Sequence, residues 1–185
     1  MSISPMTYLK ACINGARTPE AHPELPVTPE QLADAAVAAH RAGAKAVHMH
    51  PKTADGVDSL HAEVVGQAVQ AVRHAAPGLP LGVTTGFWAL SDPDERLRTV
   101  QGWTVLPDFA SVNWHEPGSE PLAHQLLQMG IGVEAGIFHA EAAAAWAKSD
   151  MAEHCMRVMI ELGPDGSPAP DNAALVSAAV QLLSR

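Results

Sequence analysis

The chain has 185 residues, of which 47% are hydrophobic and 17% are charged, and its formal net charge at pH 7 is −9. A chain of this size and composition can bury a sizeable core, so we expect one globular domain over residues 1–185. The acidic balance argues against nucleic acid as a partner, because proteins that bind phosphate backbones usually present a basic surface.

Cysteine usage and the amino-terminal sequence indicate a cytoplasmic protein. Cys12 and Cys155 each lie in an apolar run, which fits buried thiols in a reducing compartment better than a disulfide. Residues 1–10 contain neither a basic segment followed by an apolar core nor a small-residue cleavage site. No apolar run reaches membrane-spanning length, so we expect no membrane association.

Short apolar runs alternate with longer, alanine-rich segments of helical period. Strands are predicted at 8–13, 44–50, 79–85, 109–113, 131–138 and 155–162. Helices are predicted at about 28–42, 59–75, 92–103, 120–129, 140–148 and 171–183. The first helix opens with a capping-box pattern, since Thr28 precedes Pro29 and Gln31 follows three positions after Thr28. This alternation is typical of βαβ units and a parallel sheet.

The alternation permits either an open doubly wound sheet or a closed barrel, and periodicity alone does not choose between them. In both architectures the carboxyl ends of the strands carry the chemistry. Those ends here read Asn14, His48-Met49-His50, Thr84-Thr85-Gly86, Asn113-Trp114-His115-Glu116 and Glu134. A nucleotide-binding sheet would show a glycine-rich turn after its first strand, and residues 14–17 lack the further glycines. A phosphate-binding loop is therefore not expected there.

His48 and His50 are the most informative pair. Side chains two positions apart on a strand point to the same face, so both imidazoles can lie side by side at its end. Neutral imidazole binds zinc at about 2.0–2.1 Å, and a catalytic zinc site keeps one position open. The alternative is two histidines satisfied within the core or a loop, since ten histidines can produce this spacing by chance. Placement at the strand end slightly favours the metal.

Other strand-end residues also have two interpretations. Glu134 lies in an apolar strand, where a carboxylate is seldom buried unpaired, so we expect it to face the site. Asn113 is compatible with satisfying backbone groups at a strand end as well as with binding substrate. Thr84 and Thr85 favour strands in any case. His115-Glu116 is expected to be a solvated loop pair.

The order of several motifs resembles that of a known family. They are Ala11-Cys12-Ile13-Asn14-Gly15-Ala16, Pro26-Val27-Thr28-Pro29-Glu30, His48-Met49-His50, Asp55-Gly56, Thr84-Thr85-Gly86, Phe109-Ala110-Ser111-Val112-Asn113, Gly132-Val133-Glu134 and Pro164-Asp165-Gly166. With His-x-His after the second strand and Thr-Thr-Gly after the third, the chain resembles the β-keto acid cleavage enzymes over nearly its whole length. The resemblance implies a zinc-dependent TIM-type (βα)8 barrel that condenses a β-keto acid with acetyl-CoA, giving acetoacetate and a new CoA thioester.

The resemblance also implies roles for individual residues. The metal ligands would be His48, His50 and Glu161. The catalytic residues would be Thr84, Arg157 and Glu134. The residues that bind substrate would be Arg17, Asn14, Thr85 and Asn113. The small-molecule partners implied are a β-keto acid and acetyl-CoA.

Two stretches depart from the family pattern. Arg17 stands where members often carry a glutamate, which points to an acidic or otherwise changed substrate. The last-strand pattern Arg-x-Gly-x-Glu-Asp is represented only by residues 157–162, with Met159 in place of the glycine and Leu162 in place of the aspartate.

Length sets a limit on the barrel. A closed eight-stranded barrel typically needs about 250 residues, and the pattern here supplies about six βα units. We therefore expect an incomplete barrel that lacks the seventh and eighth units. An open sheet leaves strand edges that favour association, and the family assembles, so a homo-oligomer is predicted. An inactive relative, which binds a metal or small acid or assembles with a complete homologue, is the alternative function. A metal-assisted hydrolase or aldolase is a third possibility.

Overall fold

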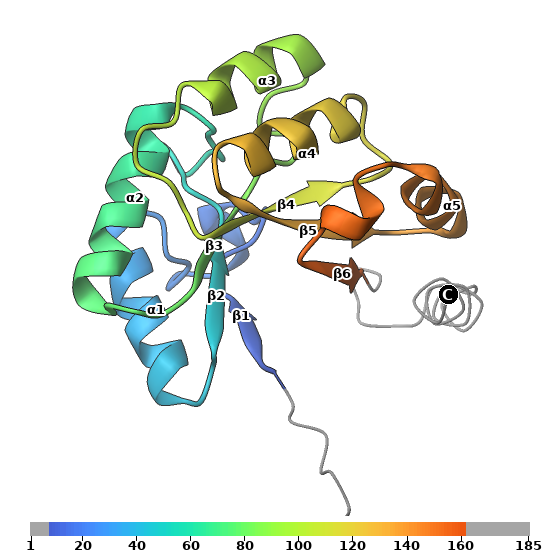
Figure 1. The fold of residues 1–185 in the computed structure, drawn as a ribbon. Helices are drawn as coiled ribbons and strands as arrows, with labels where there is room; N and C mark the ends of the chain where they lie inside the picture. The colour runs from blue at the N-terminus through green and yellow to red at the C-terminus, as the bar shows by residue number, and fades with distance from the viewer. Residues whose placement is uncertain (1–7, 162–185) are drawn as a thin grey trace, which may run out of the picture. The chain divides into compact units, whose positions relative to one another are not determined.

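The computed structural model describes residues 8–161. Backbone contacts divide the chain into two compact units. The first unit runs to Thr84 and includes residues 102–108, and the second contains residues 85–101 and the chain from Phe109 onward. Figure 1 follows the chain through both sets of strands and helices.

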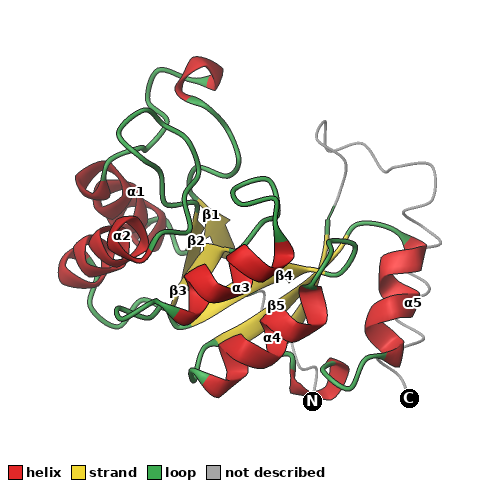
Figure 2. Cartoon of the chain, turned by 90° about the horizontal axis from the view of Figure 1, so that it is seen from above, coloured by secondary structure: helices red, strands yellow, loops and turns green. Residues whose placement is uncertain are grey.

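The first unit is a three-stranded parallel sheet with two helices. Its strands are β1 (Lys10–Cys12), β2 (Ala46–Met49) and β3 (Leu81–Thr84), and its helices are α1 (Pro29–Arg41) and α2 (Ala62–Ala75). β2 pairs with β1 on one side and with β3 on the other. The two helices lie side by side in both views (Figures 1 and 2). Every residue of β2 and β3 is buried, as is usual for parallel strands covered on both faces.

The second unit repeats this arrangement with three parallel strands and three helices. They are β4 (Phe109–Asn113), β5 (Gly132–Ile137), β6 (Arg157–Ile160), α3 (Pro93–Gln101), α4 (Ser119–Gln128) and α5 (Ala140–Lys148). β5 lies between β4 and β6. α3 and α4 contact each other, which Figure 2 shows from above the strands. Leu122 and Leu126 of α4 are fully buried in the core of this unit.

Every strand and helix predicted within the described residues is present, with boundaries that differ by a few residues. The ranges 109–113 and 140–148 match residue for residue. The helix predicted from residue 59 begins at Ala62, because Ser59 still belongs to the preceding loop and its N–H bonds to the Pro51 carbonyl. The capping box at Thr28 is confirmed, since Thr28 Oγ1 accepts from the Gln31 N–H and the Gln31 side chain accepts from the Thr28 N–H. The helix predicted at 171–183 lies outside the described residues.

Two short 3-10 turns, Pro19–Ala21 and Ala152–His154, precede α1 and β6. The prediction of two buried cysteines is wrong for Cys12, whose side chain is exposed on β1, whereas Cys155 is half-buried. No helix within the described residues is long and apolar enough to cross a membrane.

Candidate functional site

Two histidines end the second strand of the first unit. His48 lies in β2 and His50 directly follows it, and their ring centroids are 5.3 Å apart at an interplanar angle of 78°. Their relative exposures are only 4% and 7%. Alternate residues of a strand point to one face, and the juxtaposition expected from the spacing is therefore present.

His48 is an electrically neutral ligand candidate. Its Nδ1 is buried and has no hydrogen-bond partner within the described residues. Burial lowers the pKa of His48 well below the usual value, and the nearby His50 and Lys10 lower it further. The ring is therefore unprotonated near neutral pH, and an unprotonated imidazole has a lone pair with which to bind a metal.

His50 is held from behind by a carboxylate. Its Nδ1 lies 2.8 Å from Asp58 Oδ2, and the other oxygen of Asp58 forms an ion pair with the buried Lys52 ammonium. Because a carboxylate accepts, this contact suits a ring that carries a proton on Nδ1.

Asn14 ties the end of β1 to the end of β2. Its Nδ2 donates to the carbonyls of His50 (2.8 Å) and Pro26 (3.1 Å), and its Oδ1 accepts from the His50 N–H (2.8 Å). The amide is 1% exposed. In this arrangement Asn14 fixes the backbone of His50, and its predicted contact with substrate stays a prediction.

Arg17 and Thr84 are the other predicted site residues of the first unit. Arg17 is exposed and lines a hollow of about 380 Å³ together with Ile13, His22 and Leu25. Thr84 is the last residue of β3 and is buried. Thr84 therefore lies at the carboxyl end of β3, and Arg17 follows the carboxyl end of β1, as predicted.

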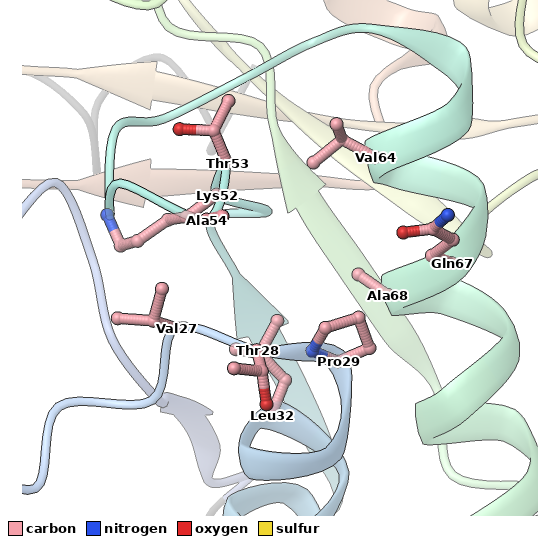
Figure 3. A pocket seen from close by; sticks show the side chains of 10 residues that line it. All are labelled: Val27, Thr28, Pro29, Leu32, Lys52, Thr53, Ala54, Val64, Gln67 and Ala68. Carbon is pink, nitrogen blue, oxygen red and sulfur yellow. The ribbon is translucent and has the colours of Figure 1, made fainter.

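A second hollow of the first unit has a volume of about 200 Å³ and is shown in Figure 3. Val64, Gln67 and Ala68 of α2 form one side of it, and the stem of Lys52 lies on the opposite side. None of the predicted site residues lines this hollow, but its wall includes the lysine that holds Asp58.

An ion pair between a buried glutamate and a half-buried arginine joins two strands of the second unit. Glu134 of β5 is 0% exposed, and its Oε1 lies 3.1 Å from Nε of Arg157, its register neighbour on β6. The Arg157 guanidinium also lies 5.1 Å from the centroid of the Phe109 ring. The paired arginine offsets the cost of burying the Glu134 carboxylate, as expected for a charge in an apolar strand.

A carboxylate network surrounds the end of β4. Glu116 Oε1 accepts from Asn113 Nδ2 at 2.8 Å, and Oε2 accepts from the Phe87 N–H at 3.0 Å and from Arg96 Nη1 at 2.6 Å. Arg96 is 1% exposed. A β-carbon on Gly136 would lie 2.4 Å from Asn113 Oδ1, so the Asn113 side chain needs a glycine at that position. The network therefore holds Asn113 in one orientation.

The same arginine binds neighbouring carbonyls. Arg96 donates to the Thr85 carbonyl at 3.3 Å and to the Pro117 carbonyl. The Thr85 hydroxyl donates to the Ser111 carbonyl at 2.6 Å. Thr85 is thus fixed through both its backbone and its side chain.

Sequence reasoning missed four residues of these clusters, namely Lys52, Asp58, Arg96 and Glu116. The prediction that His115-Glu116 is a solvated pair is wrong for Glu116, which is buried by its ion pair with Arg96, although His115 is exposed. The position of Glu116 three residues after Asn113 was the only local signal, because its arginine partner lies 20 residues away.

The predicted site residues divide between the two units. Asn14, Arg17, His48, His50 and Thr84 belong to the first, and Thr85, Asn113, Glu134, Arg157 and Glu161 belong to the second. Glu161, the predicted third metal ligand, is half-buried directly after β6. Within residues 8–161, no group of three or more His, Cys, Asp or Glu side chains is arranged to hold a metal ion. His48 and His50 supply two suitable nitrogen donors, and a third ligand stays a prediction.

Residues 7–163 match the family described as beta-keto acid cleavage enzyme. The chain is 31% identical over 106 residues to the 3-keto-5-aminohexanoate cleavage enzyme of Acetoanaerobium sticklandii, covering 57% of this chain and 38% of that protein. It is 33% identical over 96 residues to a 3,5-dioxohexanoate:acetyl-CoA acetone transferase of Paraburkholderia graminis, covering 52% of this chain and 30% of that protein. The chain thus matches between 30% and 38% of the length of these curated relatives.

Solved structures show the same fold. ObcA in complex with oxaloacetate superposes with a TM-score of 0.59 at 15% identity, covering 87% of this chain and 48% of ObcA. ObcA in complex with a C4-CoA adduct and oxalate superposes with a TM-score of 0.57 over the same shares. At this identity the likeness establishes the fold alone, which is α/β of the TIM-barrel type, incomplete at six strands within the described residues.

Proposed function

The chain belongs to the β-keto acid cleavage enzyme family, and from this premise we propose that it cleaves a β-keto acid with acetyl-CoA in a metal-dependent reaction. The bond between the keto carbon and the carboxymethyl carbon breaks, and that methylene carbon forms a new bond to the acetyl carbon. The bond between the acetyl carbon and the CoA sulfur breaks, and this sulfur forms a new bond to the keto carbon. The products are acetoacetate and a new CoA thioester, so atoms and electrons balance without a further reactant.

The observation that carries the proposal is the His48–His50 pair, buried at the end of β2 with rings 5.3 Å apart. Two imidazole nitrogens suit zinc, and we propose Glu161 as the carboxylate that completes the set. When bound, zinc would act as a Lewis acid on the keto group.

The chain's own residues would bind and orient the keto acid. Thr84 is the last residue of β3 and Thr85 follows it, and the network around Glu116 presets the orientation of Asn113. We assign these three residues to the keto acid. A side chain that is already oriented loses less conformational entropy when substrate binds.

We propose that the ion pair of Glu134 and Arg157 binds a charged group of the substrate and assists proton transfer. The Arg157 guanidinium, held by Glu134 and the Phe109 ring, would bind the substrate carboxylate. Glu134 would keep the arginine in place and assist proton movement. Arg17, exposed beside a hollow, is assigned to an acidic group of the substrate, with Asn14 positioning the adjoining backbone.

A second candidate function is that of an inactive relative which binds metal or a small acid, or which assembles with a complete homologue. Leu162 in place of the family's aspartate favours it. A cytoplasmic location and a homo-oligomeric state remain part of the main proposal.

The two candidates differ in turnover. The purified 185-residue chain, loaded with zinc, is assayed for acetoacetate formed from acetyl-CoA and a panel of β-keto acids. We expect turnover that falls by about 100-fold or more in His48→Ala, because removing one group that stabilises developing charge costs about 10²–10³. His74→Ala on the exposed side of α2 is the matched control and retains activity. Zinc bound without acetoacetate from any acid would establish the inactive relative instead.

A further inference from the structure

The loop between β2 and α2 places a carboxylate behind His50. Asp58 lies eight residues after His50 in the chain, yet its Oδ2 approaches His50 Nδ1 to 2.8 Å. Its Oδ1 pairs with Lys52, whose side chain is 1% exposed. The Asp58 side chain itself is 6% exposed. Lys52, Asp58 and His50 therefore form a continuous series of buried polar contacts.

The loop is built to bring Asp58 back to the strand end. Lys52 and Asp58 form an isolated antiparallel bridge, and the Thr53 N–H bonds to the Val57 carbonyl at 2.8 Å. The turn passes through Gly56 at φ +79°, where a β-carbon would lie 2.5 Å from the Pro19 ring. Backbone bonds and a required glycine therefore determine where the carboxylate lies, independently of the His50 contact.

Such an arrangement has a specific consequence for an imidazole. A carboxylate that accepts from Nδ1 fixes the tautomer with its proton on that nitrogen, orients the ring and makes Nε2 a better donor. Lys52 neutralises the buried Asp58 carboxylate and donates to its Oδ1, while Oδ2 contacts His50. Without Lys52, the buried Asp58 carboxylate would lack a compensating charge and would destabilise the fold.

We propose that Asp58 is a positioning residue, which holds His50 with Nε2 directed to the metal, and that Lys52 holds Asp58 in turn. The inference rests on the proposed metal site and deepens it, because it assigns the residues that determine the affinity of one ligand. No contact of Asp58 or Lys52 with substrate is needed.

The first test measures zinc affinity by competition with a chromophoric chelator. Asp58→Asn is expected to bind zinc about 10–100-fold more weakly than the wild type, the usual effect of losing such a partner. Asp55→Asn, exposed in the same loop, is the matched control and binds like the wild type. Circular dichroism and thermal unfolding establish that both variants are folded.

The outcomes separate the inference from the proposed function. A folded Asp58→Asn with wild-type zinc affinity would overturn the role of Asp58 and leave the metal site standing. A wild-type chain that binds no zinc would overturn both proposals.

A second measurement needs no change at Asp58. In metal-free wild-type protein, long-range ¹H–¹⁵N correlation spectra of the histidine rings report the tautomer, with His50→Gln identifying the signals. We expect His50 to carry its proton on Nδ1, and a proton on Nε2 would contradict the proposal even if Asp58→Asn failed to fold.

Discussion

The buried ring of His48 is difficult to protonate in the folded chain. Desolvation dominates the lowering of its pKa, and the adjacent His50 and Lys10 add to the effect. A proton on His48 is therefore costly in the folded chain, whereas the unfolded chain binds it near the ordinary value of about 6.5. This difference links stability to pH.

We predict that the metal-free protein loses stability as the pH falls below about 6.5, where the unfolded state binds a proton on His48 and the folded state does not. The contribution of this residue is up to about 1.4 kcal/mol per pH unit, until the pH passes the lowered pKa of the folded chain. Denaturant unfolding with chelator present, between about pH 7.5 and about pH 5, measures the slope. His48→Gln should show a shallower slope, and equal slopes would contradict the prediction.

The placement of some candidate site residues was predictable from the two-residue period of a strand. His48 and His50 share a face because they are two apart, and Glu134 interrupts an apolar strand, so both signals are local. Asp58 and Glu116 lie in loops, where no strand period marks them. Asp58 pairs with Lys52. Glu116 pairs with Arg96, which lies 20 residues away in the sequence.

At the scale of elements, helix and strand periods were sufficient to predict the order of the elements. Some boundaries differ from the prediction. For example, α2 begins at Ala62 and not at residue 59, because the preceding loop is longer than expected. Two glycines differ in whether their position requires glycine. Gly56 is needed for a turn, whereas Gly66 lies in the middle of α2. Sequence pattern alone does not separate them, because the difference lies in φ and in the neighbouring atoms.

We predict that Gly66→Ala stabilises the chain by about 0.5–1 kcal/mol, because alanine is the better helix former in a helix interior. The added β-carbon would meet Val105 at 3.6 Å, an ordinary contact. Gly56→Ala is the matched comparison and should destabilise, since its φ of +79° and the Pro19 ring both exclude a β-carbon. Chemical unfolding of the three proteins gives the order, and a destabilised Gly66→Ala would show that α2 tolerates no added atom there.

At the scale of the whole molecule, the family and the fold are those expected from the order of the motifs, and the number of strands is that expected from counting βα units. The family match covers residues 7–163. Residues 8–161 contain six strands, whereas a closed barrel of this type has eight. Counting units along the sequence revealed this difference, because each strand–helix repeat has its own apolar run.

The last prediction concerns the homo-oligomer that is part of the main proposal. Active sites of such barrels use loops from several strand ends around one rim, and we expect a neighbouring copy of the chain to contribute to that rim. Light scattering after size-exclusion chromatography should therefore give a mass of at least twice 19.4 kDa. Acetoacetate formation per chain should then fall on dilution as the assembly dissociates. A 19.4 kDa particle with undiminished activity per chain at low concentration would show instead that one chain suffices.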